Sequence, residues 1–101
     1  MNRAFKLYEE HKQAHFPASL RGTQIQGVDL VLLDGDTAGC IDSYFRKSGT
    51  QTSLSPEKQE MLSRCRTELS IVVKSLQDDS KEYFQRLLTI SDTILTELQN
   101  N

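Results

Sequence analysis

The sequence predicts an all-α fold, a small up-down helical bundle of three main helices plus a short N-terminal helix or arm. Two observations predict it. Apolar residues recur at spacings of three and four over most of the 101 residues, which is the periodicity of helices with one buried face. Short polar segments with helix start and stop signals interrupt this pattern. A chain of this length forms one domain, with an N-terminal helix or arm and loop over residues 1–26 and a helical core over 27–98.

The N-terminal piece has the weakest helical pattern. Ala4, Phe5, Tyr8 and His15 make a ragged apolar stripe on one side of a short helix. Pro17 is expected to end that helix, because the residue before a proline disfavours helical backbone. Residues 17–26 (PASLRGTQIQ) are predicted to form a loop.

The stretch VDLVLLDGDTAGC, residues 28–40, allows two interpretations. As a strand, it would deliver Asp34 and Asp36 to a site of the kind used by phosphatases and phosphotransferases with an aspartate nucleophile and magnesium. Thr37 stands one residue too early for the Asp-x-Asp-x-Thr motif of that superfamily. The chain is also short for such a domain and lacks the alternation of strands and helices that a parallel sheet requires.

As a helix, the same stretch separates into two faces at ~100° per residue. The apolar half holds Leu30, Val31, Leu33, Ala38, Cys40, Ile41, Tyr44 and Phe45, and the polar half holds Asp29, Asp36, Asp42, Ser43, Arg46 and Lys47. Gly49 follows as a helix stop. We therefore predict a helix over residues 27–47.

The next helix has a clear start. A polar linker over residues 49–55 ends in Ser55-Pro56-Glu57. Ser can cap the helix, Pro at its first position loses no needed N–H, and an early Glu suits the helix dipole. The predicted helix covers residues 56–76, with its apolar stripe at Leu62, Cys65, Leu69, Val72 and Leu76.

A final helix is predicted to run to the end of the chain. Asp79 and Glu82 have the spacing of a capping box at its start. Apolar residues then follow at helical spacing, at Phe84, Leu87, Leu88, Ile94, Leu95 and Leu98. Because only a few residues link this helix to the preceding one, the two are expected to lie antiparallel.

Composition and charge argue against several classes of function. The net charge of −2 and the scattered basic residues give no basic field for nucleic acid. The apolar runs are too short for a signal peptide or a membrane span, so we expect a cytoplasmic protein. Cys40 and Cys65 are interpreted as buried thiols. His11 and His15 lack a third ligand, and we expect neither a metal nor a cofactor.

One acidic residue is expected to be buried. On the helical wheel Asp34 lies in the middle of the apolar half, with Thr37 nearby, so its carboxylate must be paired or neutralised. The candidate partners on the other helices are Arg66, Arg86 and Ser91. Two interpretations remain open: a structural core interaction, or a buried polar site that binds a small ligand.

Two glycines one helical turn apart define a second stripe. Gly35 and Gly39 lie in line with Val28 and Leu32. Since glycine within a helix costs about 1 kcal/mol relative to alanine, the pair indicates close approach of another helix. That helix could be the N-terminal helix of the same chain or the same helix of a second copy.

The segment Leu33-Asp34-Gly35-Asp36-Thr37-Ala38-Gly39-Cys40 resembles a segment of a group of short bacterial proteins without an assigned activity. The resemblance extends over about residues 28–98 and also involves Phe45, Gly49, Leu62, Cys65, Leu69 and the Tyr83-Phe84-x-Arg86-Leu87 segment. It implies a bacterial source and an all-helical domain, and it transfers no functional residue.

These observations favour a non-enzymatic interaction protein that packs its helices against a second copy of itself or against another protein. The alternative is a small-ligand-binding or catalytic pocket around Asp34, with Thr37 and either Arg66 or Arg86.

Overall fold

The structure, a computed structural model, describes residues 3–45 and 54–99 and is predominantly helical. Four helices are present in these ranges: α1 (Arg3–His11), α2 (Leu30–Phe45), α3 (Pro56–Val73) and α4 (Asp78–Gln99). Between α1 and α2 lie a short 3-10 helix, η1 (Ala18–Leu20), and two short antiparallel strands, β1 (Gln24–Ile25) and β2 (Val28–Asp29). None of the described helices is long and apolar enough to cross a membrane.

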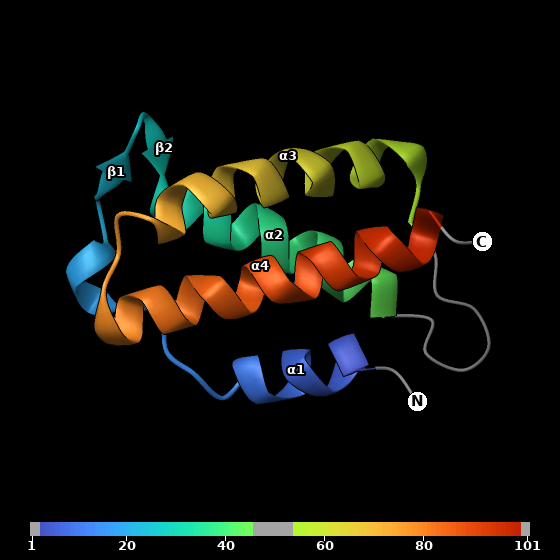
Figure 1. The fold of residues 1–101 in the computed structure, drawn as a ribbon, viewed down its shortest axis with the longest axis horizontal. Helices are drawn as coiled ribbons and strands as arrows, with labels where there is room; N and C mark the ends of the chain where they lie inside the picture. The colour runs from blue at the N-terminus through green and yellow to red at the C-terminus, as the bar shows by residue number, and fades with distance from the viewer. Residues whose placement is uncertain (1–2, 46–53, 100–101) are drawn as a thin grey trace.

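The helices lie side by side, with α4 in contact with all three others (Figure 1). α3 runs in the opposite direction to α2, and α4 in the opposite direction to α3. α3 and α4 thus lie side by side and run in opposite directions. α1 packs along α4.

The core forms where the apolar stripes of the four helices meet. The apolar side chains that are fully buried are, in chain order, Ala4, Leu30, Ile41, Leu62, Leu69, Val72, Phe84, Leu87, Ile90 and Ile94. Most of these positions were predicted from spacing alone. Cys40 and Cys65 are buried free thiols, as predicted, and burial raises the pKa of both.

The start of α2 differs from the prediction. The helix begins at Leu30 rather than near residue 27, because residues 24–29 form a hairpin with Ile25 paired to Val28. Its two-residue turn has positive φ at both Gln26 (53°) and Gly27 (79°), the backbone of a type I′ turn. Asp29, expected on the polar helical face, instead accepts a 3.0 Å hydrogen bond from the Leu32 N–H. The predicted end at residue 47 lies outside the described residues.

The predicted cap of α3 is confirmed. The Lys58 N–H donates to Ser55 Oγ at 3.2 Å, and Pro56 occupies the first turn. The helix ends at Val73, three residues earlier than predicted, although Leu76 is still buried. The predicted linker over residues 49–55 lies mostly outside the described residues.

The start of α4 and the end of α1 differ from the prediction. α4 begins at Asp78, so Asp79 lies within its first turn rather than at the capping position. α1 ends at His11, well before Pro17, and His11 rather than His15 lies on its buried side.

Candidate functional site

Asp34 lies on α2 at a half-buried position and is bound from α4. The Tyr83 hydroxyl donates a 2.8 Å hydrogen bond to Asp34 Oδ1. Burial raises the pKa of Asp34, and the hydrogen bond from Tyr83 acts in the opposite direction. Burial and the neighbouring carboxylate together raise the pKa of Tyr83. Of the three partners predicted for Asp34, none makes this bond.

A chain of contacts, first between rings and then between polar groups, continues from Tyr83 to the surface. The His11 ring packs on the Tyr83 ring with centroids 4.4 Å apart. Arg86 Nε–H donates to His11 Nδ1 at 3.1 Å, and Arg86 Nη1 pairs with Glu82 Oε1 at 3.0 Å. We call these five residues, Asp34, Tyr83, His11, Arg86 and Glu82, the His11 cluster. It ties α1, α2 and α4 together.

His11 is neutral in this arrangement. Burial, followed by the positive charge of Arg86, lowers the pKa of His11 to about 4. A neutral imidazole can accept the hydrogen bond from Arg86, whereas a protonated one cannot. The acceptor nitrogen is therefore already occupied, and the geometry fits a structural contact that holds α1 on α4 better than a catalytic base.

A hollow of about 480 Å³ adjoins the His11 cluster. It is lined by Ala14, His15, Phe16, Pro17, Ala18, Asp79, Glu82, Tyr83 and Arg86. Asp34 does not line it, because Tyr83 lies between the two. Of the residues in the pocket hypothesis, Arg86 lines this hollow and Asp34, Thr37 and Arg66 do not.

Thr37 and Ser91 are both fully buried. Thr37 Oγ1 donates to the Leu33 carbonyl at 2.7 Å, within its own helix. Ser91 Oγ has no hydrogen-bond partner among the described residues. Neither hydroxyl contacts Asp34 through a hydrogen bond in the described part of the chain, so these predicted residues do not assemble into one site.

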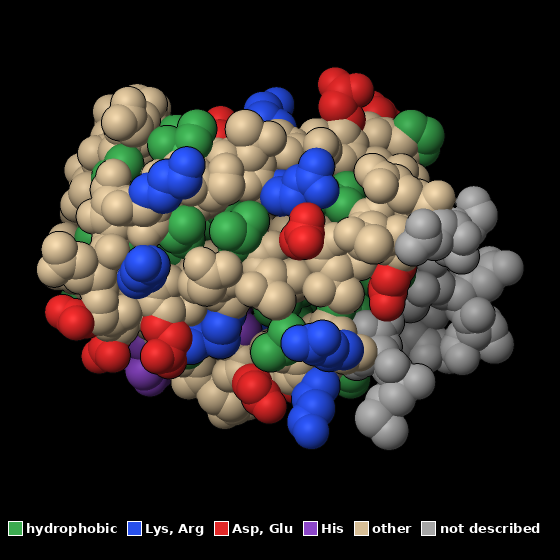
Figure 2. All heavy atoms as spheres, viewed as in Figure 1, with side chains coloured by type: hydrophobic (Ala, Val, Ile, Leu, Met, Phe, Trp, Pro, Cys, Tyr) green, Lys and Arg blue, Asp and Glu red, His purple; other side chains and the backbone are tan. Residues whose placement is uncertain are grey.

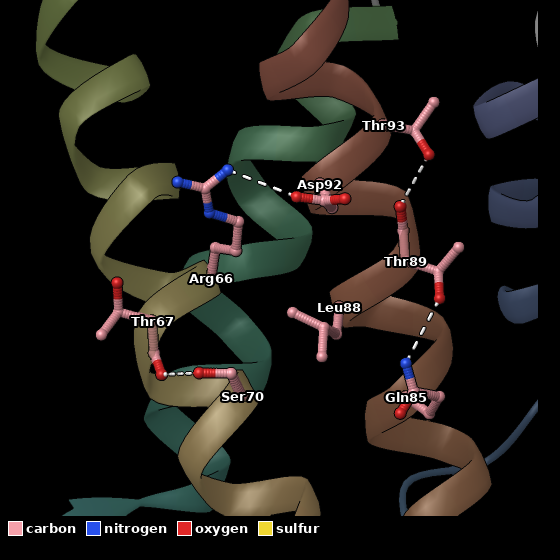
Figure 3. A pocket seen from close by; sticks show the side chains of 8 residues that line it. All are labelled: Arg66, Thr67, Ser70, Gln85, Leu88, Thr89, Asp92 and Thr93. Carbon is pink, nitrogen blue, oxygen red and sulfur yellow. Dashed lines mark hydrogen bonds and ion pairs between the residues drawn. The ribbon is translucent and has the colours of Figure 1, made fainter.

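Arg66 lies on a different side of the molecule, at a hollow of about 440 Å³ between α3 and α4. Figure 3 shows it reaching across to Asp92, with the paired atoms 3.3 Å apart. The other bonds drawn there stay within one helix: Ser70 Oγ donates to the Thr67 carbonyl, Thr93 Oγ1 to the Thr89 carbonyl, and Gln85 Nε2 to Thr89 Oγ1. This shallow site thus holds polar groups that largely bond one another.

The glycine stripe faces outward from α2. A Cβ at Gly35 or Gly39 would meet no heavy atom of the described chain within 4 Å, beyond its own helix and neighbours. Leu32 is 64% exposed. We call Leu32, Gly35, Asp36 and Gly39 the α2 outer face. Val28, predicted to extend this stripe as part of the helix, belongs to β2 instead.

The N-terminal helix does not cover the α2 outer face. α1 packs on α4 and reaches α2 at other positions, where the Tyr8 hydroxyl donates to the Ala38 carbonyl and the Phe5 ring meets Phe45 edge-on. The prediction that the N-terminal helix of the same chain could cover the stripe is therefore wrong. The other expected occupant, a second copy of the chain, stays a prediction.

The charged side chains visible in Figure 2 are interspersed. Lys and Arg side chains alternate with Asp and Glu, and the described residues on this face form no continuous basic surface. Within residues 3–45 and 54–99, no group of three or more His, Cys, Asp or Glu side chains could hold a metal ion.

No protein-family model, curated protein or solved structure shows a significant match to this chain.

Sequence reasoning missed His11 and Tyr83, although one signal for His11 was present. Ala4, Tyr8 and His11 have the spacing i, i+4, i+7 of one helix face, and all three are buried. No local signal could have revealed that Tyr83 binds Asp34, which lies 49 residues away.

Proposed function

We propose that this chain is a non-enzymatic interaction protein, in which an up-down bundle of three main helices presents the α2 outer face to a partner helix. The observation that carries the proposal is the open space beside Gly35 and Gly39, next to the exposed Leu32. Nothing in the described chain uses this space.

The two glycines of the α2 outer face destabilise their own helix. Each costs about 1 kcal/mol relative to alanine within a helix, and neither has a positive φ that would require glycine. Packing within the described chain does not require them either, since a Cβ would fit at both positions. The absence of a side chain at both positions would allow the backbone of a partner helix to approach α2 closely. Leu32 would then form the apolar contact with that partner.

The alternative, a ligand-binding or catalytic pocket around Asp34, has less support. Thr37 bonds back to its own helix, and Arg66 pairs with Asp92 on another side of the molecule. Arg86 belongs to the His11 cluster but contacts His11 and Glu82 rather than Asp34. The groups that would have to converge on one ligand are therefore separated.

Site-specific photocrosslinking tests the proposal. A photoreactive benzoylphenylalanine at position 32 should give a discrete crosslinked product in an extract of the source cells, whereas the same group at the exposed Glu10 of α1 should not. Adding Gly35→Leu to the position-32 protein should abolish the product, while circular dichroism shows that the fold is kept. Equal crosslinking from both positions, or none from position 32, would refute the proposed role of this face.

A further inference from the structure

Negative charge is concentrated around α2. Residues 22–45 hold four of the 14 acidic residues and none of the 12 Lys and Arg residues. These four are Asp29, Asp34, Asp36 and Asp42. The chain as a whole is nearly neutral, at −2. Asp34 is bonded to Tyr83 of α4 and Asp42 lies near Tyr8 of α1, so a partner on the outer side of α2 meets Asp29 and Asp36.

The same charge borders a hollow beside the α2 outer face. This hollow, of about 390 Å³, lies between β2, α2 and α3, and Val28, Leu32 and Leu33 provide its apolar wall. Its lining also includes three acidic residues, Asp29, Asp36 and Glu68, and one basic residue, Arg64. It therefore combines apolar contact area with a net negative rim.

The apolar surface continues along α3. Ile71 follows Glu68 by three residues and so lies one turn further along the same side of the helix; it is exposed. At the other end of α2, Lys58 Nζ is bonded to Ser43 Oγ at 2.6 Å. Basic charge from α3 thus reaches α2 at that end, while the hollow near Leu32 keeps its acidic rim.

This charge pattern disfavours a second copy as the occupant. If two α2 helices packed face to face, Asp36 and its neighbouring carboxylates would meet identical carboxylates at close range. Like charges brought together across an interface cost several kcal/mol and select against that pairing. A helix of opposite charge would gain from the same arrangement.

We infer that the α2 outer face binds a basic amphipathic helix of another protein. Its apolar residues would pack on Leu32, the hollow and Ile71, and the two glycines would let its backbone come close. Its Lys or Arg side chains would pair with Asp36, Asp29 and Glu68. This inference rests on the proposed function, because it names the partner of the same face.

Two synthetic peptides test the partner's chemistry. Each is an amphipathic helix of about 18 residues, long enough to form a stable helix on a surface, with the same leucine face. One carries lysines on its polar face and the other carries glutamates. Binding to the full chain is measured by fluorescence anisotropy, and the binding surface by shifts of the backbone amides of Leu32, Gly35 and Gly39.

We expect the lysine peptide to bind and shift these amides, and the glutamate peptide to bind at least about tenfold more weakly. Asp36→Lys should weaken the lysine peptide roughly fivefold, whereas Glu10→Lys, a matched charge change on α1, should leave its affinity unchanged. Raising the salt concentration from about 0.05 M to 0.3 M should also weaken the binding of the lysine peptide to the wild-type protein, because salt screens the charges.

Other outcomes separate this inference from the proposed function. Equal binding of both peptides to the α2 outer face, or a position-32 crosslink to a second copy of the chain, would overturn the basic partner and leave the interaction role standing. Binding of the lysine peptide away from Leu32, Gly35 and Gly39 would overturn the inference. Failure of both the peptides and the crosslink at this face would overturn both proposals.

Discussion

Lowering the pH from about 6.5 to 4 is expected to destabilise this protein through His11. Its pKa is lowered from 6.5 to about 4 in the folded state. Between these values the unfolded chain binds a proton on His11 and the folded chain does not, so the stability contributed at neutral pH is lost as the pH falls. Below about pH 4 both states are protonated and the loss levels off.

The magnitude follows from the size of this shift. One pKa unit corresponds to about 1.36 kcal/mol, so a shift from 6.5 to about 4 gives an upper value of about 3.4 kcal/mol. His11 is buried, but the Arg86 side chain, whose charge is the second cause of the pKa shift, is 24% exposed. Solvent screening there reduces the expected loss to about 2 kcal/mol.

The groups around His11 do not all act in the same direction. Arg86 from α4 adds to the lowering of the His11 pKa. Asp34, which faces His11 through Tyr83, has a raised pKa and so contributes stability that is greatest at low pH and is lost as the pH rises. A variant that removes only the titration of His11 separates the two effects.

His11→Gln provides this comparison, because the glutamine side chain keeps a hydrogen-bond acceptor and does not titrate. Urea unfolding of both proteins should be measured at pH 7 and pH 4.5. We expect wild type to lose about 2 kcal/mol more than the variant between the two pH values. A parallel loss in both proteins, or an NMR titration of His11 with a midpoint near 6.5, would refute the reasoning.

Two substitutions give further expected outcomes. Gly39→Ala should raise the free energy of unfolding by about 0.5–1 kcal/mol, because the helix gains a better helix former and the added Cβ has open space; destabilisation by thermal melting would show that this space is occupied. Ser91→Ala should stabilise the fold by about 1 kcal/mol, because it removes a buried hydroxyl without a hydrogen-bond partner in the described chain. An unchanged or lower urea midpoint would mean that Ser91 Oγ is satisfied in solution.

The sequence by itself determined most of the helical architecture. Local relations, between residues within one or two turns of each other, determine the positions of α3 and α4, the cap at Ser55 and most of the buried stripe. Apolar periodicity and capping residues in the sequence indicate such relations. The hairpin before α2 was missed because the apolar run starting at Val28 fits a helix equally well. Only the type I′ turn at Gln26 and Gly27 distinguishes the two.

The tertiary structure decided which side chains meet. Asp34 bonds Tyr83 rather than the predicted Arg66, Arg86 or Ser91, and Arg86 bonds His11 from 75 residues away. Such contacts depend on how whole helices are placed, and no local pattern records that placement. The same placement puts α1 on α4 and leaves the space beside Gly35 and Gly39 open. Of the two occupants that the sequence allowed for this stripe, it rules out α1 and leaves a partner outside the chain.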